Sequence, residues 1–282
     1  MKRNYILVTP MKNEENNIGK TIDSVVAQVL KPKLWIIVDD ASDDNSAKIV
    51  IDKSKKNKWI KLLSLTKRQK YDLGIHYSEV CIDGFKQAIR MAKIRHIEYD
   101  YVGLMDADTI LESDYFLMLI LKFEQNKNLG LASGNLVNII GDKKQTPKVK
   151  SNQVCGTGRM WTKACFINTG GYTKTCAPDT VSEIKAKLRN YEVNRFKDIS
   201  VYQNRLTASN AGLWNGYKSI GYRQYYIHIN PIHAILKAIK LTLIKPFYLG
   251  IAYFIGYFGS WLCIKPKLED QQIKYYNWHR FT

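Results

Sequence analysis

Hydrophobic positions in the first half of the chain alternate between two kinds of spacing. Short runs of consecutive apolar residues, many of them β-branched, are separated by longer segments in which apolar residues recur every three or four positions. Runs of the first kind are typical of buried strands, and segments of the second kind are typical of helices that pack one face. The pattern predicts strands at Tyr5–Val8, Leu34–Val38, Ile60–Leu65, Tyr101–Met105 and Leu129–Ser133.

The segments between these runs predict helices. The residues that mark them are Ile18, Ile22, Val25, Val26 and Val29 before a stop at Lys31-Pro32, then Ala47, Val50 and Ile51, then residues 79–95, then Tyr115–Glu124. Strands that alternate with helices form a mainly parallel, doubly wound sheet flanked by helices, so the expected fold class is α/β. In such sheets a ligand binds beyond the carboxyl ends of the strands.

Polar and acidic residues follow three of the predicted strands. Thr9–Glu15 comes after the first, Asp39–Asp44 after the second and Asp106–Asp108 after the fourth. We expect these segments to line one cleft. Asp106 and Asp108 can then reach a common Mg²⁺ or Mn²⁺, since hard cations take oxygen ligands and share them with phosphates. Solvated turn aspartates are the alternative interpretation.

Two further patterns exclude other classes of protein. Neither Gly-x-Gly-x-x-Gly nor Gly-x-x-x-x-Gly-Lys-Ser/Thr follows the first strand, which disfavours a dinucleotide-binding fold and a phosphate-loop NTPase. The five cysteines are odd in number and no two are spaced as Cys-x-x-Cys. We therefore expect reduced, mostly buried thiols in a cytosolic environment, and neither a zinc site nor a disulfide framework.

The strand-end segments resemble the motifs of the family-2 glycosyltransferases of GT-A fold. The resemblance rests on Val8–Ile18, Ile36–Asp44 and Leu104–Thr109, which occur in the order and at about the spacing of that family. It continues through Gly156-Thr157-Gly158, Gly170-Gly171-Tyr172 and Ala177-Pro178-Asp179-Thr180, and covers roughly residues 4–195. The resemblance implies a GT-A fold and a transfer, with inversion, of a sugar from a nucleoside-diphosphate sugar.

The resemblance also implies roles for the residues that match. Those expected to bind the nucleotide sugar are Thr9, Pro10, Asn13, Glu14, Asp39, Asp40, Asp106, Asp108 and Gly156. Among them, Asp39 or Asp40 resembles the carboxylate that binds the base, and Asp106 and Asp108 resemble the pair that faces the ribose and a diphosphate-bound Mg²⁺ or Mn²⁺. For Gly156 an ordinary turn glycine is the alternative.

Asp179 stands where the family has its general base. The residue before it is Pro178, whereas the family often has Glu there. A carboxylate that takes the proton of an acceptor hydroxyl contributes on the order of 10²–10⁴ in rate. A single base of this kind implies direct displacement at the anomeric carbon. No Gln-x-x-Arg-Trp, the motif of processive relatives, occurs, which favours transfer of a single sugar.

The C-terminal part of the chain differs in charge and polarity. The net charge is +18, and the stretch Ile199–Leu268 contains eight Lys and Arg but no Asp or Glu. Many Tyr and Trp residues lie among these basic residues, which is typical of a nucleic-acid groove or of a membrane interface. Pro246–Ile264 then has no charged residue in 19 positions, and lysines flank both of its ends. This favours the membrane interface.

We therefore expect a catalytic domain at residues 1–228 and membrane-associating helices with a tail at residues 229–282. A membrane-embedded hairpin or interfacial helix pair is favoured over a single membrane crossing, and packing against the catalytic domain is the alternative. The expected partners are a nucleotide-sugar donor, an anionic membrane surface and a membrane-linked or glycan acceptor at the cytoplasmic face, which includes polyprenyl phosphate. No nucleic acid is expected.

Two other classes of function stay open. A non-catalytic nucleotide-sugar-binding or scaffold protein would keep the same fold, but the presence of Asp106, Asp108 and Asp179 argues against it. A nucleic-acid-binding module would use the basic residues, with an affinity that falls steeply with salt. That hypothesis leaves the acidic strand ends unexplained.

Overall fold

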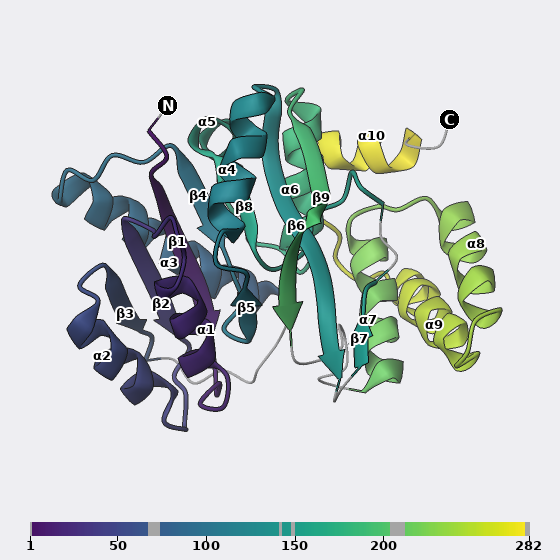
Figure 1. The fold of residues 1–282 in the computed structure, drawn as a ribbon. Helices are drawn as coiled ribbons and strands as arrows, with labels where there is room; N and C mark the ends of the chain where they lie inside the picture. Colours follow the sequence, from purple (N-terminus) through teal and green to yellow (C-terminus); the bar gives the residue numbers. More distant parts are fainter. Residues whose placement is uncertain (1, 67–73, 141–142, 148–149, 204–211, 280–282) are drawn as a thin grey trace.

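The computed structural model describes residues 2–66, 74–140, 143–147, 150–203 and 212–279. These residues form one sheet with helices packed on both of its faces, and a group of C-terminal helices lies beyond one end of it (Figure 1). The α/β fold class predicted from the sequence is confirmed. Arg205, one of the eight basic residues of the C-terminal stretch, lies outside the described residues.

The described sheet has nine strands in the order β3-β2-β1-β4-β8-β6-β9-β5, and β7 pairs with β6. The strands are β1 (Tyr5–Met11), β2 (Leu34–Asp39), β3 (Ile60–Ser64), β4 (Tyr101–Leu104), β5 (Thr109–Leu111), β6 (Leu129–Ile140), β7 (Lys143–Gln145), β8 (Arg159–Thr162) and β9 (Glu192–Gln203). Strands β3, β2, β1 and β4 are parallel, and so are β6 and β9. Strand β8 runs antiparallel to both of its neighbours. The sheet is therefore mainly parallel, as predicted.

Six of the helices in the described part of the chain flank the sheet. They are α1 (Ile18–Val26), α2 (Ser46–Lys56), α3 (Ile75–Ile94), α4 (Tyr115–Gln125), α5 (Lys163–Asn168) and α6 (Pro178–Leu188). Alternate residues of β1 serve the two faces: Tyr5 and Leu7 belong to the core under α1, α2 and α4, whereas Ile6 and Val8 belong to the core under α3 and α5. The first helix ends three residues earlier than Val29, whose side chain is exposed.

Helix α3 packs closely on the parallel part of the sheet. A Cβ atom added to Gly84 would lie 2.5 Å from Val8 Cγ1 and 2.7 Å from Val38 Cγ2. Only a glycine allows this approach, because every other residue carries a Cβ atom. The close packing fixes the N-terminal end of α3 beside the carboxyl ends of β1 and β2.

The C-terminal helices are α7 (Leu213–Tyr226), α8 (Pro231–Thr242), α9 (Tyr248–Leu262) and α10 (Gln271–His279). Helix α9 packs against both α7 and α8, and Gly256 of α9 lies against the backbone carbonyl of Lys218 in α7. Helix α10 returns to the α/β part and contacts α6. Its Asn277 side-chain amide donates a hydrogen bond to the carbonyl of Ile227, at the end of α7, at 2.7 Å. Among the described helices, none combines the length and the apolar composition needed to cross a bilayer.

The burial of most cysteines agrees with the sequence prediction. All five are free, and four of them, Cys81, Cys155, Cys165 and Cys176, are buried. Cys263, which follows α9, is exposed.

Candidate active site

The loops that follow β1 and β2 are tied together by side-chain hydrogen bonds. The backbone N–H of Asn13 donates to Ser42 Oγ at 2.9 Å, and the side-chain oxygen of Asn13 accepts from the backbone N–H of Asp43 at 2.9 Å. The backbone N–H of Glu14 donates to Ser46 Oγ at 2.7 Å. Asn13 has a φ of +53°, a left-handed conformation that asparagine tolerates better than most residues. The two loops therefore form one rigid wall of the site.

The neighbouring aspartates on this wall have different environments. The Asp40 carboxylate accepts a hydrogen bond from the Lys12 ammonium at 3.1 Å and lies 2.8 Å from His76 Nε2. Asp39 accepts from the backbone N–H of Ser42 at 3.2 Å through one oxygen. Both carboxylates are buried. Asp40 is thus enclosed by cationic or hydrogen-bonding side chains, whereas no charged side chain is recorded against Asp39 among the described residues.

Asp106 and Asp108 follow β4 and share one donor. The side-chain amide of Gln203, at the end of β9, donates to Asp108 Oδ1 at 3.0 Å and lies 3.4 Å from Asp106 Oδ2. The Tyr77 hydroxyl of α3 donates to Asp106 Oδ1 at 3.0 Å. Both carboxylates thus lie beside one amide group, and the prediction that they reach a common Mg²⁺ or Mn²⁺ stays a prediction.

The chemistry of these donors fits a divalent metal ion. The described residues contain no group of three or more His, Cys, Asp or Glu side chains that could enclose an ion. Asp106 and Asp108 would therefore supply carboxylate oxygens, and the diphosphate and water would supply the rest, a pattern that Mg²⁺ favours. Tyr77 and Gln203 are neutral, so they orient the carboxylates without cancelling their charge.

Asp179 lies in the first turn of α6, close to a buried arginine. Its Oδ1 accepts a hydrogen bond from the Tyr172 hydroxyl at 2.8 Å and lies 3.2 Å from Arg159 Nη1. The Asp179 side chain is 39% exposed, whereas that of Arg159 is fully buried. Burial, the largest single effect, lowers the pKa of Arg159, but Asp179, Tyr172, Glu183 and Tyr77 together outweigh it, so the pKa is raised. Arg159 therefore stays charged and holds Asp179 in place.

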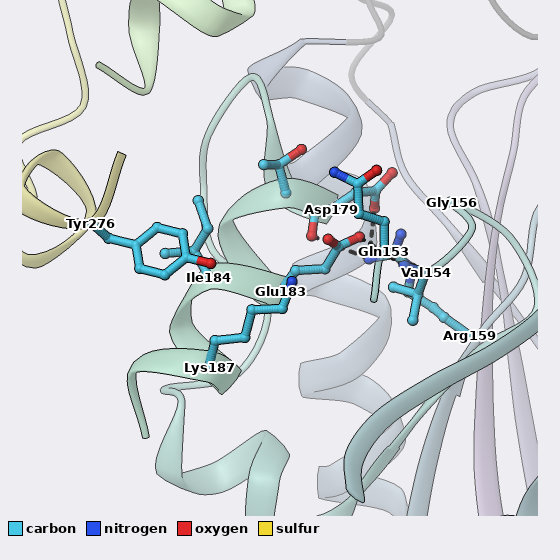
Figure 2. A pocket seen from close by; sticks show the side chains of 10 residues that line it. Gln153, Val154, Gly156, Arg159, Asp179, Glu183, Ile184, Lys187 and Tyr276 are labelled. Carbon is cyan, nitrogen blue, oxygen red and sulfur yellow. Dashed lines mark hydrogen bonds and ion pairs between the residues drawn. The ribbon is translucent and has the colours of Figure 1, made fainter. Parts of the chain in front are cut away.

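A pocket of about 210 Å³ opens beside Asp179 (Figure 2). Its lining includes Gly156 on one side, Glu183 and Lys187 of α6 along the floor, and Tyr276 of α10 at the far end. Burial raises the pKa of Glu183 to about 7, although the Arg159 charge and the hydrogen bond from the Val154 N–H act in the opposite direction. Lys187, four residues after Glu183 on α6, donates to the Asn152 carbonyl at 2.6 Å.

A buried cluster connects Asp106 with Asp179. Tyr77, which donates to Asp106, and Cys81 lie one turn apart on α3. Burial first, and then the nearby charges of Asp106 and Asp179, raise the pKa values of both groups. Asp106 and Asp179 therefore both lie near enough to Tyr77 and Cys81 for their charges to affect these buried groups.

The remaining predicted residues lie around this site in different ways. Thr9 is fully buried, and its hydroxyl accepts a hydrogen bond from the Trp35 indole at 3.0 Å. Pro10 is partly exposed near the end of β1, and Glu14 accepts from the Asn17 amide at 2.7 Å. A Cβ atom on Gly156 would lie 3.1 Å from Asp179 Oδ2, so this glycine lies beside the candidate base. The ligand-binding roles of these residues stay predictions.

Four residues that contact the carboxylates of the site were not found from the sequence. Arg159 begins β8, a strand that was not predicted. His76 and Tyr77 lie in the first turn of α3, which begins before the residues 79–95 predicted for that helix, and Gln203 ends a strand that was not predicted. The spacing of the histidines along the sequence did not indicate a role for His76, because the carboxylate that it contacts, Asp40, is distant in sequence. A search for polar residues at helix starts on the same sheet edge would have drawn attention to His76 and Tyr77.

The family model for "Glycosyl transferase family 2" matches residues 6–182. The chain belongs to this family. It is therefore a glycosyltransferase, and the matched segment holds the strand-end loops, Asp106, Asp108 and Asp179 together.

Curated relatives in the family are polysaccharide synthases. The chain is 24% identical over 294 residues to a poly-beta-1,6-N-acetyl-D-glucosamine synthase of Staphylococcus epidermidis, with 95% of this chain and 67% of the relative covered. It is 25% identical over 222 residues to the synthase of the same name from Staphylococcus aureus, with 72% of this chain and 50% of the relative covered. The chain thus spans between half and two thirds of the length of these relatives.

Solved structures confirm the GT-A fold. A mannosyltransferase from Pyrobaculum calidifontis in complex with GDP-Man and Mn²⁺ aligns with a TM-score of 0.61 at 16% identity, over 93% of this chain and 87% of that one. Residues 1–349 of S. aureus TarS in complex with UDP-GlcNAc align with a TM-score of 0.55 at 15% identity, over 96% of this chain and 78% of that one. At these identities the likeness establishes the fold alone.

Proposed function

We propose that the chain is a metal-dependent, inverting glycosyltransferase that moves a sugar from a nucleoside-diphosphate sugar to a hydroxyl or phosphate of a membrane-presented acceptor. The observation that carries the proposal is the placement of Asp179. Its carboxylate is held by Arg159 and Tyr172, is partly exposed to a pocket, and lies across a buried cluster from Asp106. In a family-2 chain this arrangement supplies two carboxylates, Asp106 and Asp108, on the side of the diphosphate, and a third, Asp179, that can act as the base.

The donor nucleotide binds between the loops that follow β1 and β2. Pro10, Asn13 and Glu14 would line the pocket, and the backbone near Thr9 would contribute in place of its engaged hydroxyl. Asp39 is the better candidate for a base N–H, because Lys12 and His76 already occupy the Asp40 carboxylate. The nucleotide sugars named for the neighbouring structures, UDP-GlcNAc and GDP-Man, support this class of donor.

Asp106 and Asp108 would hold Mg²⁺ or Mn²⁺ on the diphosphate. A bound divalent cation supplies Lewis-acid stabilisation of the charge that develops on the leaving diphosphate. Gln203 and Tyr77 orient the two carboxylates toward that position. The Mn²⁺ named in the mannosyltransferase complex is consistent with such a site.

Asp179 takes the proton of the acceptor hydroxyl. The acceptor oxygen forms a bond to the anomeric carbon while the bond from that carbon to the diphosphate oxygen breaks, and the proton passes to Asp179. Arg159 and Tyr172 keep the carboxylate pointing into the pocket, which lowers the cost of orientation in the transition state. One displacement from the opposite side inverts the configuration at the anomeric carbon.

The acceptor enters through the pocket between α6 and α10. Tyr276 presents a ring at its outer end, and aromatic rings pack well against the apolar face of a sugar. The acceptor is a lipid-linked saccharide, a glycan or polyprenyl phosphate, presented at the cytoplasmic face of an anionic membrane. The polymer named for the curated relatives supports a glycan acceptor.

A donor screen tests the proposal. Purified full chain is incubated with UDP- and GDP-sugars, with Mn²⁺, Mg²⁺ or EDTA, and release of the nucleoside diphosphate is measured together with the thermal unfolding temperature. We expect one donor to raise the unfolding temperature and to be hydrolysed only with metal. The variant Asp106→Asn/Asp108→Asn should lose the metal effect, and Glu112→Gln, which removes the carboxylate that follows β5, serves as control. A chain that binds a donor but releases no diphosphate with any acceptor would be a scaffold.

A further inference from the structure

The C-terminal helices carry large apolar side chains on the side that is exposed to solvent. In α8 the small residues Ala234 and Ala238 are buried against the protein, whereas Ile232, Ile235, Leu236 and Ile239 are exposed. The exposed positions repeat every three or four residues, so they form a continuous stripe along the helix. Such a stripe normally faces a core, but in α8 it faces outward.

Helix α9 continues this apolar surface. Its buried side contains Tyr253, Gly256 and Tyr257, which pack against α7, whereas Ile251 and Ile255 are exposed on the other side. Figure 1 shows α8 and α9 next to each other on the side of α7 that faces away from the sheet. The name "outer face of the hairpin" is used below for six exposed residues: Ile232, Ile235, Leu236, Ile239, Ile251 and Ile255.

The connection and the end of the hairpin are still more exposed. Leu243 between the helices is 76% exposed, and Leu262 and Ile264 at the end of α9 are 74% and 86% exposed. Scattered apolar residues are normal on a protein surface, but a contiguous set of this size marks an interaction surface. No described element of the chain covers these three residues.

The basic residues around the outer face of the hairpin indicate what kind of surface this face binds. Lys240, Lys245 and Lys265 are exposed at its borders, and the sequence contains no Asp or Glu from Ile199 to Leu268. A second copy of the chain would bring the same lysines together, and like charges oppose such a contact. A surface that combines acyl chains with anionic headgroups matches both the apolar stripe and its basic border.

A recess after α9 adds a place for a headgroup. It has a volume of about 570 Å³ and is lined by Tyr225, Trp261, Leu262, Ile264, Lys265 and Lys267. The Lys267 ammonium lies 4.4 Å from the centre of the Tyr225 ring, which holds that charge at the wall of the recess. Apolar residues and ammonium groups in one recess fit a molecule with a phosphate at one end and an acyl chain at the other.

We infer that the outer face of the α8–α9 hairpin docks on an anionic lipid bilayer, with its Ile and Leu side chains among the acyl chains and Lys240, Lys245 and Lys265 at the level of the headgroup phosphates. The inference rests on the proposed function and deepens it, because docking by this face would hold the enzyme beside a membrane-linked acceptor.

Vesicle binding by the full chain tests the inference. Cys263 is the exposed member of the five cysteines, so an environment-sensitive fluorophore can be attached at the edge of the docking face. With phosphatidylcholine vesicles that contain a minority of phosphatidylglycerol, we expect a blue shift of the label and co-sedimentation of the protein. Phosphatidylcholine alone and free inorganic phosphate should produce far less of either signal. The same label on the cysteine introduced by the variant Cys263→Ser/Ile94→Cys, at the end of α3, should show no shift.

Matched substitutions separate the apolar contribution from the charge. Ile239→Glu should weaken binding by about ten-fold or more, since it removes an inserted side chain. Ile94→Glu, on the similarly exposed Ile94 of α3, should leave binding unchanged. Lys240→Gln/Lys245→Gln should weaken binding at low salt by about 5-fold per lysine, whereas Lys55→Gln/Lys56→Gln on α2 should have little effect.

Three results would overturn the inference. In the first, the unchanged protein does not bind anionic vesicles. In the second, Ile239→Glu binds them as well as the unchanged protein does. In the third, the unchanged protein is a dimer, Ile239→Glu is a monomer, and neither binds vesicles. Donor hydrolysis in solution should be the same in all these variants, because none of the substituted residues touches the site. A protein that docks but never hydrolyses a donor would reject the proposed function and leave the docking inference intact. A protein that hydrolyses a donor but does not bind vesicles would reject the docking inference and leave the proposed function intact.

Discussion

Asp179 is the residue on which the proposed chemistry depends most directly. Replacement by Asn keeps the shape of the side chain but removes its capacity to take a proton. We expect Asp179→Asn to lower the rate of transfer to an acceptor on the order of 10²–10⁴-fold while donor affinity changes little. Steady-state transfer rates and calorimetric titration with the donor measure the two quantities.

The control for Asp179 is its own hydrogen-bond donor. Tyr172→Phe leaves the carboxylate and Arg159 in place and removes the 2.8 Å hydrogen bond, so it should lower transfer by about ten-fold or less. Transfer by Asp179→Asn within a few-fold of the unchanged enzyme would show that another group is the base.

Glu183 gives the site a dependence on pH. Burial raises its pKa in the folded protein to about 7, above the value of 4.5 for an unperturbed glutamate. Between these two values the folded state holds a proton that the unfolded state has lost, so the stability of the folded state falls as pH rises from about 4.5 to 7 and then levels off. The variant Glu183→Gln keeps an acceptor for the Val154 N–H and never ionises.

We therefore expect Glu183→Gln to be more stable than the unchanged protein at pH 8 by roughly 2–4 kcal/mol, and by much less at pH 4.5. Urea unfolding at a series of pH values measures the difference between the two proteins. A difference that stays constant across this range would mean that Glu183 has the same pKa in the folded and unfolded states.

At the level of single residues, the sequence could predict the carboxylates but not their partners. Asp106, Asp108 and Asp179 occur in motifs whose spacing along the chain is informative. His76, Tyr77 and Gln203 contact those motifs from elements far away in sequence, and nothing in their neighbours marks them. Contacts of this kind depend on how α3 packs on the sheet and where β9 pairs within it, which only the folded chain shows.

Individual elements were predictable to the degree that their hydrophobic spacing was regular. The parallel strands β1, β2 and β4 are fully buried or nearly so, and apolar runs mark them clearly. Strand β8 has four residues, too few for a period to show. Strand β9 carries charged residues and has a register irregularity opposite Gly134 and Asn135, so its alternation is broken.

The close packing of α3 on the sheet leads to a prediction about that element. Gly84→Ala would place a methyl group within 2.7 Å of both Val8 and Val38, so we expect a loss of about 1–3 kcal/mol in the free energy of unfolding. Gly19→Ala in α1 is the matched control, since its new atom would meet Ile49 at an ordinary 3.8 Å. The control should be neutral or slightly stabilising, because alanine favours helices. Chemical denaturation measures the free energy of unfolding of both variants. Equal values would mean that α3 can move away from the sheet without a loss of stability.

On the scale of the whole molecule, the acidic residues of the site and the basic C-terminal stretch lie in different parts of the fold. The acidic residues of the site gather at the carboxyl edge of the sheet, whereas the acid-free stretch forms the end of β9 and all of α7, α8 and α9. One of its alternative interpretations, packing against residues 1–228, is seen in the contact of one side of α9 with α7. The other side of α9 is exposed, and membrane contact there stays a prediction. The hydropathy of Pro246–Ile264 alone could not separate these two roles.

The division of the chain at residue 228 separates elements that contact each other. Tyr225 of α7 packs edge-on against Tyr257 of α9, with ring centres 5.9 Å apart, and the Leu268 N–H donates to the Tyr226 carbonyl at 2.9 Å. We expect a chain of residues 1–228 to unfold about 10 °C or more below the full chain, because burial of several aromatic side chains is lost. Differential scanning calorimetry measures both chains, and donor hydrolysis is assayed alongside. If residues 1–228 unfold at the temperature of the full chain and hydrolyse the donor equally well, the C-terminal helices serve docking alone and contribute nothing to the stability of the catalytic part.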